Sequence, residues 1–478
     1  MGKVTLRGVT TVFDEIPYTN LPFSQTRPAT LATVAALHGL TAPDPRSARV
    51  LELGCGAGAN LAGIAAAAPD VRALGVDLAA TAIDAAQEIA SAAGLDNVRF
   101  EVADVTELGD GRLGEFDYVI VHGLYAWGDE RLRAATLEAC RAHMAPDGLA
   151  YVSYNSHPGG YIRRMLREMG QFHARGLADP RERAERARQL FALLHRLGEA
   201  GGPTFYDGVL GQDVHALAVG PQEMLVHDLL SPEYEPVWLV DFVAAARATG
   251  LDYVADALPE ASRQPPWSDA VEAFVVQASG GDRVAREQYF DFLVVRRFRH
   301  SVLCRAGREP AGAIDPAALH GLLVEAAGDG DGSEPGPLLV AALTELAGAP
   351  RPVAFADLRA ALGADADALA EALLEGFHAD RVLFHAVPLP GAAEPGPQPT
   401  ASPLARSQAR PGALLTALTN QIVRINDEPT AGLVRLLDGT RDRAAIIRDF
   451  TAAGFGPMTA EALEDALRHF ARARLLVA

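Results

Sequence analysis

Lysine is almost absent from this sequence, cysteine is scarce, and long apolar runs are missing. Lys3 is the only lysine in 478 residues, so arginine supplies nearly all of the positive charge. The three cysteines, Cys55, Cys140 and Cys304, lack the paired spacing of disulfides or metal ligands, which fits a reducing compartment. No apolar run approaches the ~20 residues of a membrane-spanning helix, and the N-terminus has no secretory signal pattern. We therefore expect a cytoplasmic protein with no membrane insertion and no metal site.

Basic side chains are also fewer than acidic ones. The chain has 61 acidic and 42 basic residues, which gives a formal net charge of −19. Because contacts with phosphates need basic surface, this balance disfavours a nucleic-acid partner. Hydrophobic residues make up 49% of the chain, which is enough for large cores. Since single cores stop growing near ~250–300 residues, we expect roughly two to four domains.

The most informative feature that is present is a glycine-rich turn. The apolar residues Val50, Leu51 and Leu53 predict a strand, and the alternating glycines Gly54, Gly56 and Gly58 predict a tight turn. A small-residue helix follows. The N-terminus of such a helix gathers backbone N–H groups around a ligand. The pattern also fits a dinucleotide site, in which Asp77, at the end of the next predicted strand, would bind a ribose hydroxyl. The turn alone therefore leaves the ligand open.

A carboxylate beside the turn favours one of the two ligands. Glu52 would repel a pyrophosphate but suits a cation, such as a sulfonium with its α-amino group. With Glu52, the run Glu-Leu-Gly-Cys-Gly-Ala-Gly resembles motif I of the class I S-adenosylmethionine-dependent methyltransferases. In that superfamily the end of the third strand, here Asp104 and Val105, holds the adenine. We therefore expect S-adenosylmethionine as the cofactor, with a nicotinamide dinucleotide as the alternative.

Strands and helices alternate from Arg49 to Asn155, and this order is interrupted afterwards. The alternation predicts a doubly wound, mostly parallel α/β sheet, whose ligands bind at the carboxyl ends of the strands. Residues 161–177 and 180–197 predict two amphipathic helices of an insertion. We expect an N-terminal cap over the cofactor at 1–48, a Rossmann-like catalytic domain at 49–156 and 236–308, a helical insertion at 157–235, and winged-helix-like α+β modules at 309–390 and 404–478.

Candidate side chains for the methyl acceptor follow the fourth and fifth predicted strands. Tyr125 and Trp127 follow the fourth strand, while Tyr154 and Asn155 end the fifth. Aromatic faces attract a sulfonium or an ammonium by ~0.5–2 kcal/mol each, and the Asn155 carboxamide is suited to orient an amine. The alternative for Tyr125 and Trp127 is core packing. For the nearby His157 we expect a place in a turn, with the role of a base as the alternative.

The cofactor is expected to contact the strand ends and the N-terminal cap together. His122 more readily packs beside the cofactor than abstracts a proton. The predicted cofactor-binding residues are Tyr18, Gln25, Thr26, Glu52, Gly54, Gly56, Gly58, Asp77, Leu78, Asp104, Val105 and His122, and the predicted catalytic residues are Tyr125, Trp127, Tyr154 and Asn155.

Five longer motifs resemble one group within this superfamily. They are Tyr18–Pro28, His122–Trp127, Tyr154–Gly159, Glu235–Phe242 and Tyr289–Arg299. These motifs resemble the methyltransferases with a methyltransferase regulatory domain, which include rickettsial protein-lysine methyltransferases acting on outer-membrane protein B. The resemblance implies a homodimer, a cofactor pocket closed by the N-terminal cap, and a lysine ε-amine of a protein as the acceptor.

Departures from the pattern of this group fall on the acceptor side, at Arg27, Gly128 and Ser156–His157. In addition, residues around Leu433–Thr440 resemble small peptide-binding chaperones of ribosomal-peptide biosynthesis. We expect methyl transfer to an amine of a protein or peptide, with lysine as the first choice. The alternatives are methylation of a small metabolite or a ribosomal natural-product peptide, and a non-catalytic protein that senses S-adenosylmethionine.

Overall fold

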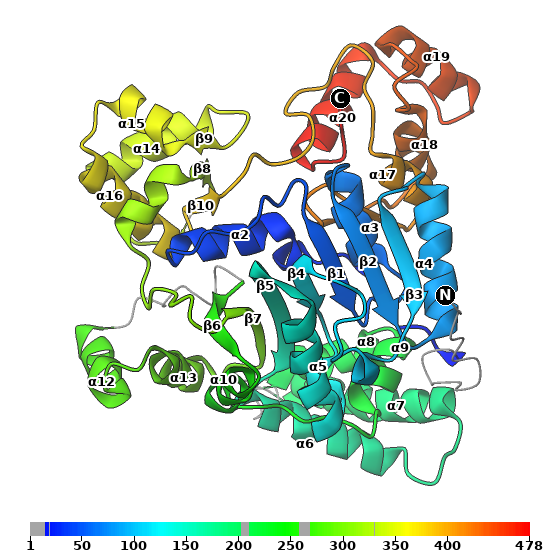
Figure 1. The fold of residues 1–478 in the computed structure, drawn as a ribbon. Helices are drawn as coiled ribbons and strands as arrows, with labels where there is room; N and C mark the ends of the chain where they lie inside the picture. The colour runs from blue at the N-terminus through cyan, green and yellow to red at the C-terminus, as the bar shows by residue number, and fades with distance from the viewer. Residues whose placement is uncertain (1–14, 19, 202–209, 258–267, 329) are drawn as a thin grey trace.

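The fold is built on a seven-stranded sheet, shown in a computed structural model that describes residues 15–18, 20–201, 210–257, 268–328 and 330–478 (Figure 1). The strand order is β3-β2-β1-β4-β5-β7-β6. Strands β1 to β5 run parallel, whereas β7 pairs antiparallel with both β5 and β6. This mostly parallel sheet confirms the predicted fold class. The strands are β1 (Arg49–Leu53), β2 (Arg72–Asp77), β3 (Val98–Val102), β4 (Phe116–Val121), β5 (Met144–Asn155), β6 (Leu251–Asp256) and β7 (Phe298–Arg305).

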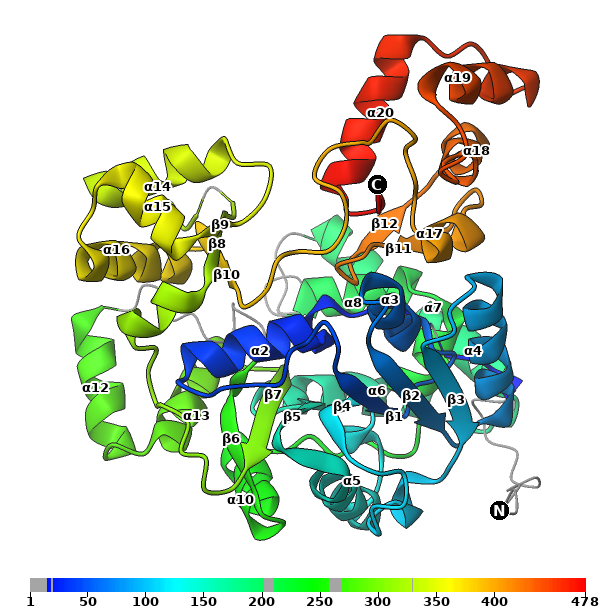
Figure 2. The ribbon, with the colours of Figure 1, turned by 45° about the horizontal axis from the view of Figure 1, so that its top comes forward.

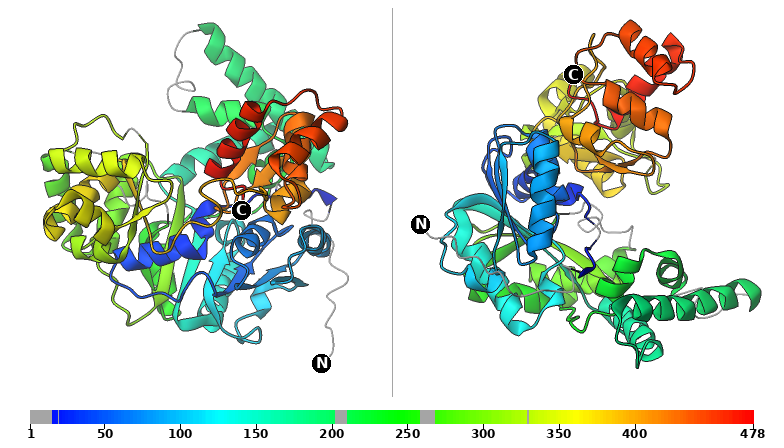
Figure 3. Two further views of the ribbon diagram at one scale, coloured as in Figure 1. Left: turned by 90° about the horizontal axis from the view of Figure 1, so that it is seen from above. Right: turned by 90° about the vertical axis from the view of Figure 1, so that its right-hand side faces the viewer.

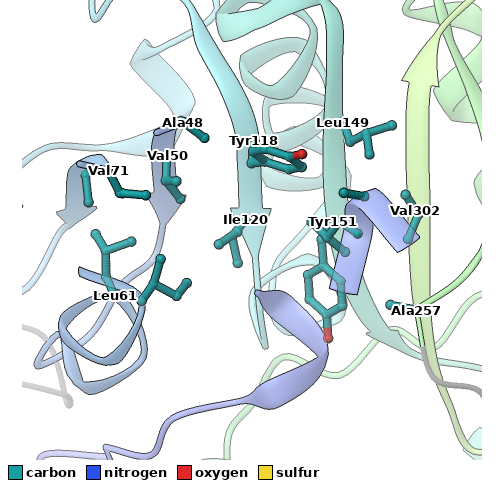
Figure 4. Close-up of a cluster of buried hydrophobic side chains, with 14 of the residues drawn as sticks. Ala48, Val50, Leu61, Val71, Tyr118, Ile120, Leu149, Tyr151, Ala257 and Val302 are labelled. Atoms are coloured by element: carbon teal, nitrogen blue, oxygen red, sulfur yellow. The ribbon is translucent and has the colours of Figure 1, made fainter. Parts of the chain in front are cut away.

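Helices cover both faces of the sheet and enclose two apolar cores. Neighbouring residues of a strand face opposite sides, so Val50 and Tyr118 enter one core, while Leu51 and Val119 enter the other. Figure 4 shows the first core, which includes Val50 and Tyr118. Burial on both faces explains why the strands are apolar along their length. Helices α2 (Pro28–Leu37), α3 (Ala59–Ala67) and α4 (Ala80–Ala92) cover the first face; α5 (Glu130–His143), α10 (Leu239–Ala248) and α13 (Arg283–Val294) cover the second, and α12 (Asp269–Ser279) precedes α13.

A helical insertion interrupts the alternation after β5. Its helices share a separate core that includes Leu166, Phe191 and Leu225, and Ile16 of the N-terminal segment also packs there. The insertion and the N-terminal segment are therefore joined at this core. None of the helices in the described ranges combines the length and apolar character that a bilayer crossing needs. The insertion contains α6 (Gly159–His173), α7 (Pro180–Gly201), α8 (Gly211–Val219), α9 (Gln222–Met224) and a π-helical turn at Leu225–Leu229.

Two small α+β modules follow β7. The first has a sheet of order β10-β8-β9 and a core that Leu37 of α2 also joins. The second contains a hairpin of β11 and β12 and lies over α3 and α4 (Figures 2 and 3). The first module comprises β8 (Leu323–Ala326), α14 (Pro337–Ala347), β9 (Val353–Ala354), α15 (Phe355–Leu362), α16 (Ala366–His378) and β10 (Val382–His385); the second comprises α17 (Pro403–Gln408), β11 (Leu414–Thr416), β12 (Ile422–Arg424), α18 (Glu428–Leu436), α19 (Arg443–Ala452) and α20 (Ala460–Arg472).

A buried ion cluster ties the last two strands to α13. The Arg299 side chain on β7 is fully buried and contacts three carboxylates. Its nitrogens lie 2.8 Å from Asp291, 3.1 Å from Asp256 and 3.4 Å from Glu287. The Tyr253 hydroxyl accepts a further N–H at 3.1 Å. Because β7 lies between β5 and β6, this cluster supports the strand that carries Tyr154 and Asn155.

We predict that Arg299→Met strongly destabilises the fold. Removal of the guanidinium leaves several buried carboxylates without their counter-charge, which costs about 3–5 kcal/mol for a broken buried pair. The free energy of unfolding from urea titration, followed by circular dichroism, measures this loss. Arg46→Ala is the control, because the Arg46–Asp44 pair lies on the surface and its loss should leave the urea midpoint unchanged. An unchanged midpoint for Arg299→Met would contradict the role of the cluster.

Candidate active site

The glycine-rich turn after β1 passes directly into the N-terminus of α3. Gly54, Gly56 and Gly58 have φ values of 73°, 52° and 76°, in the left-handed region that other residues rarely adopt. A Cβ on Gly58 would lie 2.7 Å from both Ala86 and Phe100, so a side chain has no room there. A Cβ on Gly56 would meet nothing within 4 Å, because this glycine faces open space. At Gly56 the turn therefore presents bare backbone to open space.

Asp77 ends β2 and faces this turn. Its Oδ2 accepts a hydrogen bond from Gly56 N at 2.9 Å, and its Oδ1 accepts one from Ala79 N at 2.9 Å. A carboxylate oxygen accepts more than one hydrogen bond, so Asp77 can hold the turn and still bind hydroxyls. The neighbouring Leu78 is 40% exposed and offers apolar surface at the same edge.

Asp104 stands at the next strand end. It caps a short 3-10 helix, Val105–Glu107, and its Oδ1 accepts from both Thr106 N and Thr106 Oγ1 at 2.8 Å. Val105 itself is buried in the core. Since β3, β2 and β1 are neighbours in the sheet, Asp104, Asp77 and Glu52 follow one another along its carboxyl edge.

Glu52 is the buried carboxylate of this row. It is 3% exposed; its Oε1 accepts from Asn60 Nδ2 at 2.7 Å, and its Oε2 has no hydrogen-bond partner among the described residues. Burial, reinforced by the charge of Asp77, raises the pKa of Glu52 to about 8, although the bond from Asn60 opposes the shift. A cationic group of a ligand beside Oε2 would supply the missing partner. The site therefore fits a ligand with a positive charge.

The N-terminal cap lies against the glycine turn and α3. Asn20 donates to Ala57 O and accepts from Ala59 N, both at 2.9 Å. The buried Thr26 hydroxyl lies 3.0 Å from Asn60 Oδ1. Gln25 lies beside the Tyr151 hydroxyl. Of the predicted cap, residues 1–14 and 19 lie outside the described residues.

Tyr18 occupies the outer end of the cap. Its side chain is 45% exposed, and its hydroxyl donates to Asp228 Oδ2 at 3.1 Å. Burial raises the pKa of Asp228, which also pairs with Arg163 at 3.2 Å. Tyr18 therefore connects the cap to the helical insertion.

His122 lies between the cap and the sheet. Its ring stacks on Phe23 with a centroid distance of 3.8 Å, and its Nδ1 lies 3.1 Å from the Tyr151 hydroxyl and 3.2 Å from Ser153 Oγ. Burial, together with the neighbouring His300, lowers the pKa of His122 to about 3. The imidazole is therefore neutral at physiological pH, which agrees with a packing role.

Both predicted catalytic tyrosines are core residues. Tyr154 is 1% exposed, its ring lies 4.2 Å from that of Phe242, and its hydroxyl shares a hydrogen bond with Ser301 Oγ at 3.0 Å. Tyr125 is 3% exposed and packs edge-on against Phe242 at 5.2 Å. Burial raises the pKa of Tyr125 to about 12. These contacts give both rings a structural role that the sequence pattern did not separate from catalysis.

Asn155 has a different environment at the end of β5. The residue is 2% exposed, and its Nδ2 is buried with no hydrogen-bond partner among the described residues. A buried amide group without a partner costs about 1–3 kcal/mol, so a bound group that accepts this N–H would be stabilised by it. Nearby, His157 stacks on Tyr161 at 4.0 Å and lies in a turn, as the sequence predicted.

Trp127 stands at the outer rim of this side. Its ring lies 5.4 Å from that of Tyr234, and the guanidinium groups of Arg167 and Arg163 lie over it at 5.4 and 5.8 Å. Trp127 thus belongs to an aromatic and cationic cluster between β4 and the insertion. Of its two arginines, Arg163 pairs with Asp228 at 3.2 Å, whereas Arg167 donates to the backbone carbonyls of Asp228, Ser231 and Glu233.

Three protein families match segments of this chain. The "Methyltransferase domain" family matches residues 50–148, the "Predicted methyltransferase regulatory domain" family matches 221–305, and the "PKMT, C-terminal winged helix domain" family matches 397–454. An uncharacterised protein of Rickettsia prowazekii is 30% identical over 235 residues, which are 49% of this chain and 93% of the relative. The chain belongs to the S-adenosylmethionine-dependent methyltransferases with a methyltransferase regulatory domain. Its cofactor is S-adenosylmethionine.

Other relatives of this methyltransferase support the same fold. A second uncharacterised protein of Rickettsia prowazekii is 34% identical over 295 residues, which are 61% of this chain and 52% of that relative, so the chain spans about half of its length. The structure of PKMT2 from Rickettsia typhi in complex with AdoHcy is 22% identical, with a TM-score of 0.84 over 97% of this chain and 100% of that one.

The methyltransferase site contains residues that the sequence analysis did not select. Asn60 joins Glu52 to the cap, and Asp228 joins Tyr18 to Arg163. The sequence could have pointed to Asn60, because it is the only polar side chain in the helix Ala59–Ala67. It could not have pointed to Asp228, since this residue lies 210 positions from Tyr18.

We predict that Asp77→Ala in this methyltransferase lowers affinity for S-adenosylhomocysteine by roughly a hundredfold or more. The Asp77 carboxylate would no longer accept hydrogen bonds from two hydroxyls of the ligand, which are worth ~1.5–3 kcal/mol each. Gly56 N would also lose its acceptor. Isothermal titration calorimetry measures the dissociation constant. The exposed Asp70 provides the control, Asp70→Ala, which should bind normally. Equal affinities of the two variants would contradict the assignment.

The raised pKa of Glu52 predicts a pH-dependent affinity. Without ligand the carboxylate ionises near pH 8, and only the ionised form attracts a cation. Affinity for S-adenosylhomocysteine should therefore rise by up to about tenfold per pH unit between pH 6 and 8, with release of a proton on binding. Calorimetry in buffers of different ionisation enthalpy measures that proton. Glu52→Gln should bind more weakly and show no such release; a pH-independent wild type would refute the assignment.

Proposed function

We propose that this chain transfers a methyl group from S-adenosylmethionine to an amine of a protein or peptide, most simply to the ε-amine of a lysine. When bound, S-adenosylmethionine supplies the methyl group on a sulfonium sulfur. Glu52, Asp77 and Asp104 would hold the cofactor along the carboxyl edge of the sheet, with the glycine turn beneath it. The residues of the chain then have two tasks, to position the acceptor and to favour its neutral form.

The observation that carries this proposal is the unpartnered amide of Asn155. A neutral amine has a lone pair that accepts an N–H, and the buried Nδ2 of Asn155 offers one. An ammonium ion has no acceptor and cannot satisfy this group. The amide therefore favours the protonation state that can receive a methyl group.

The charge around Trp127 supports the same assignment. A lysine ammonium has a pKa of ~10.4, so its deprotonation at pH 7 costs about 4–5 kcal/mol. Arg167, which lies over the Trp127 ring and forms no ion pair among the described residues, disfavours a second positive charge beside it. This repulsion offsets part of the cost of deprotonation.

Similar proteins support a protein acceptor over a small metabolite. Residues 397–454 match the PKMT winged-helix family, and the chain has the same fold as PKMT2. Its longer motifs also resemble those of protein-lysine methyltransferases. We propose the domain division given above, with the winged-helix-like modules as protein-contacting units. We also propose a cytoplasmic homodimer, for which analytical ultracentrifugation is the direct measurement. Exposed apolar side chains on α12 and α13, such as Phe274 and Phe292, are candidates for the contact.

The proposal is tested with cofactor that carries a labelled methyl group. Incubation with host lysate should place the label in protein or peptide, and mass spectrometry of the labelled band should locate it on lysine. Label confined to low-mass material would instead support a small metabolite. Binding of S-adenosylhomocysteine without labelling of any fraction would support the non-catalytic, cofactor-sensing alternative.

We predict that Asn155→Ala separates catalysis from cofactor binding. Turnover on the labelled acceptor should fall at least about tenfold, since a buried hydrogen bond of ~1.5 kcal/mol or more is lost. The dissociation constant for S-adenosylhomocysteine should stay within about threefold. Gln398→Ala removes an exposed carboxamide and is the matched control for turnover. Unchanged turnover of Asn155→Ala would remove the main support for an amine acceptor.

A further inference from the structure

The turn between β11 and β12 reaches from the C-terminal module to the cofactor site. Asn420 in this turn has a φ of 54°, a left-handed conformation that asparagine tolerates better than most residues. Asn420 N donates to Ala417 O at 2.9 Å, which closes the turn. The side chain is 1% exposed and points away from its own module. Figure 2 shows the hairpin above α3.

The Asn420 side chain binds Asn60 at the start of α3. Its Nδ2 lies 3.0 Å from Asn60 O and 3.1 Å from Asn60 Oδ1, across 360 positions of sequence. Gly63 makes this approach possible, because a Cβ there would lie 2.4 Å from Asn420 Oδ1 and 2.8 Å from Thr416 Cγ2. A larger residue on this turn of α3 would push the hairpin away.

A second contact fixes the same module to the catalytic sheet. Leu404 on α17 is 1% exposed and packs with Ala62 of α3 and Ala93 at the end of α4. Small side chains on these two helices leave room for the leucine. The Asn420 contact is therefore held by apolar packing and does not depend on one hydrogen bond.

The orientation of the Asn60 amide depends on these neighbours. Phe23 N donates to Asn60 Oδ1 at 2.9 Å, and a backbone N–H cannot accept, so the amide oxygen must face this group. Asn420 Nδ2 donates to the same oxygen. The opposite end of the amide, Nδ2, then points to Glu52 Oε1 at 2.7 Å. A flipped amide would turn its oxygen toward the carboxylate.

We propose that Asn420 is a positioning residue for the cofactor site. Together with Phe23 N and the Thr26 hydroxyl, which contact the same amide oxygen, it holds the Asn60 amide. This keeps an N–H donor on Glu52 and so favours the carboxylate that receives the cationic cofactor. Cofactor affinity then depends on the docking of the C-terminal module on α3. This inference rests on the proposed function, since it concerns the same cofactor site.

Asn420→Asp is the sharpest test. The replacement keeps the shape and suits a positive φ, but it puts an anion where Asn60 O and Oδ1 require a donor. We expect S-adenosylhomocysteine to bind at least tenfold more weakly at pH 7 by calorimetry. Gln421→Glu is the matched control, because it adds the same charge one position away on an exposed side chain. Its affinity should stay within twofold of the wild type.

Asn420→Gly is a second variant, chosen because it should fold normally. Glycine takes the positive φ without strain, so the module should keep its melting temperature while Asn60 loses one donor. We expect a three- to tenfold loss of affinity. Both variants should also shift the pH midpoint of binding upward, because Glu52 loses support for its ionised form. The other groups near Glu52, namely Asp77 on β2, Cys55 in the turn and Tyr151 on β5, are unchanged.

A role limited to holding the module would lower stability but leave the pH midpoint in place. The inference is overturned if both variants bind S-adenosylhomocysteine within twofold of the wild type, or if affinity falls with no change in midpoint. Either result leaves the proposed function standing as long as the wild type binds the cofactor product and labels an acceptor. Failure of the wild type to bind would instead overturn the proposed function itself.

Discussion

The hydrogen bond from Asn60 to the buried carboxylate of Glu52 is the interaction on which the rest of the site depends. A carboxylate inside an apolar sheet is costly unless a donor or a cation compensates it. Asn60 supplies one donor through its Nδ2. Its Oδ1, at the other end of the amide, accepts hydrogen bonds from the N-terminal cap and from the C-terminal hairpin. The remaining oxygen, Oε2, has no partner in the described chain and is suited to a cationic ligand. Four separate segments of the sequence thus meet at one amide.

The two sides of the site follow different physical rules. On the cofactor side, the ends of β1, β2 and β3 carry carboxylates, and two of these also brace backbone groups. On the acceptor side, the end of β5 carries an unpartnered amide, and the rim near Trp127 carries arginines. Negative charge suits a cationic cofactor, while positive charge keeps an amine neutral. This contrast agrees with the amine acceptor that we propose.

Much of the fold was predictable because its signals are local. Alternating strands and helices, ended by glycine turns, predict a parallel sheet from chain neighbours alone, and β1 to β5 agree. The cofactor was predictable from Glu52 in the glycine motif together with Asp77 and Asp104 at the next two strand ends. Tyr154 was harder to judge. Its position at the end of β5 suggests catalysis, but the structure packs its ring on Phe242, which lies far away in sequence.

The sequence by itself determined the class of fold, the glycine turn and the charge of the ligand, because each depends on residues within about one strand and one turn of each other. Only the tertiary structure showed that Asn420 reaches Asn60 and that Asp228 faces Tyr18. Hydrogen bonds across such separations depend on how modules dock, and docking follows from packed surfaces such as the contact of Leu404 with Ala62. No local pattern in the chain records that geometry.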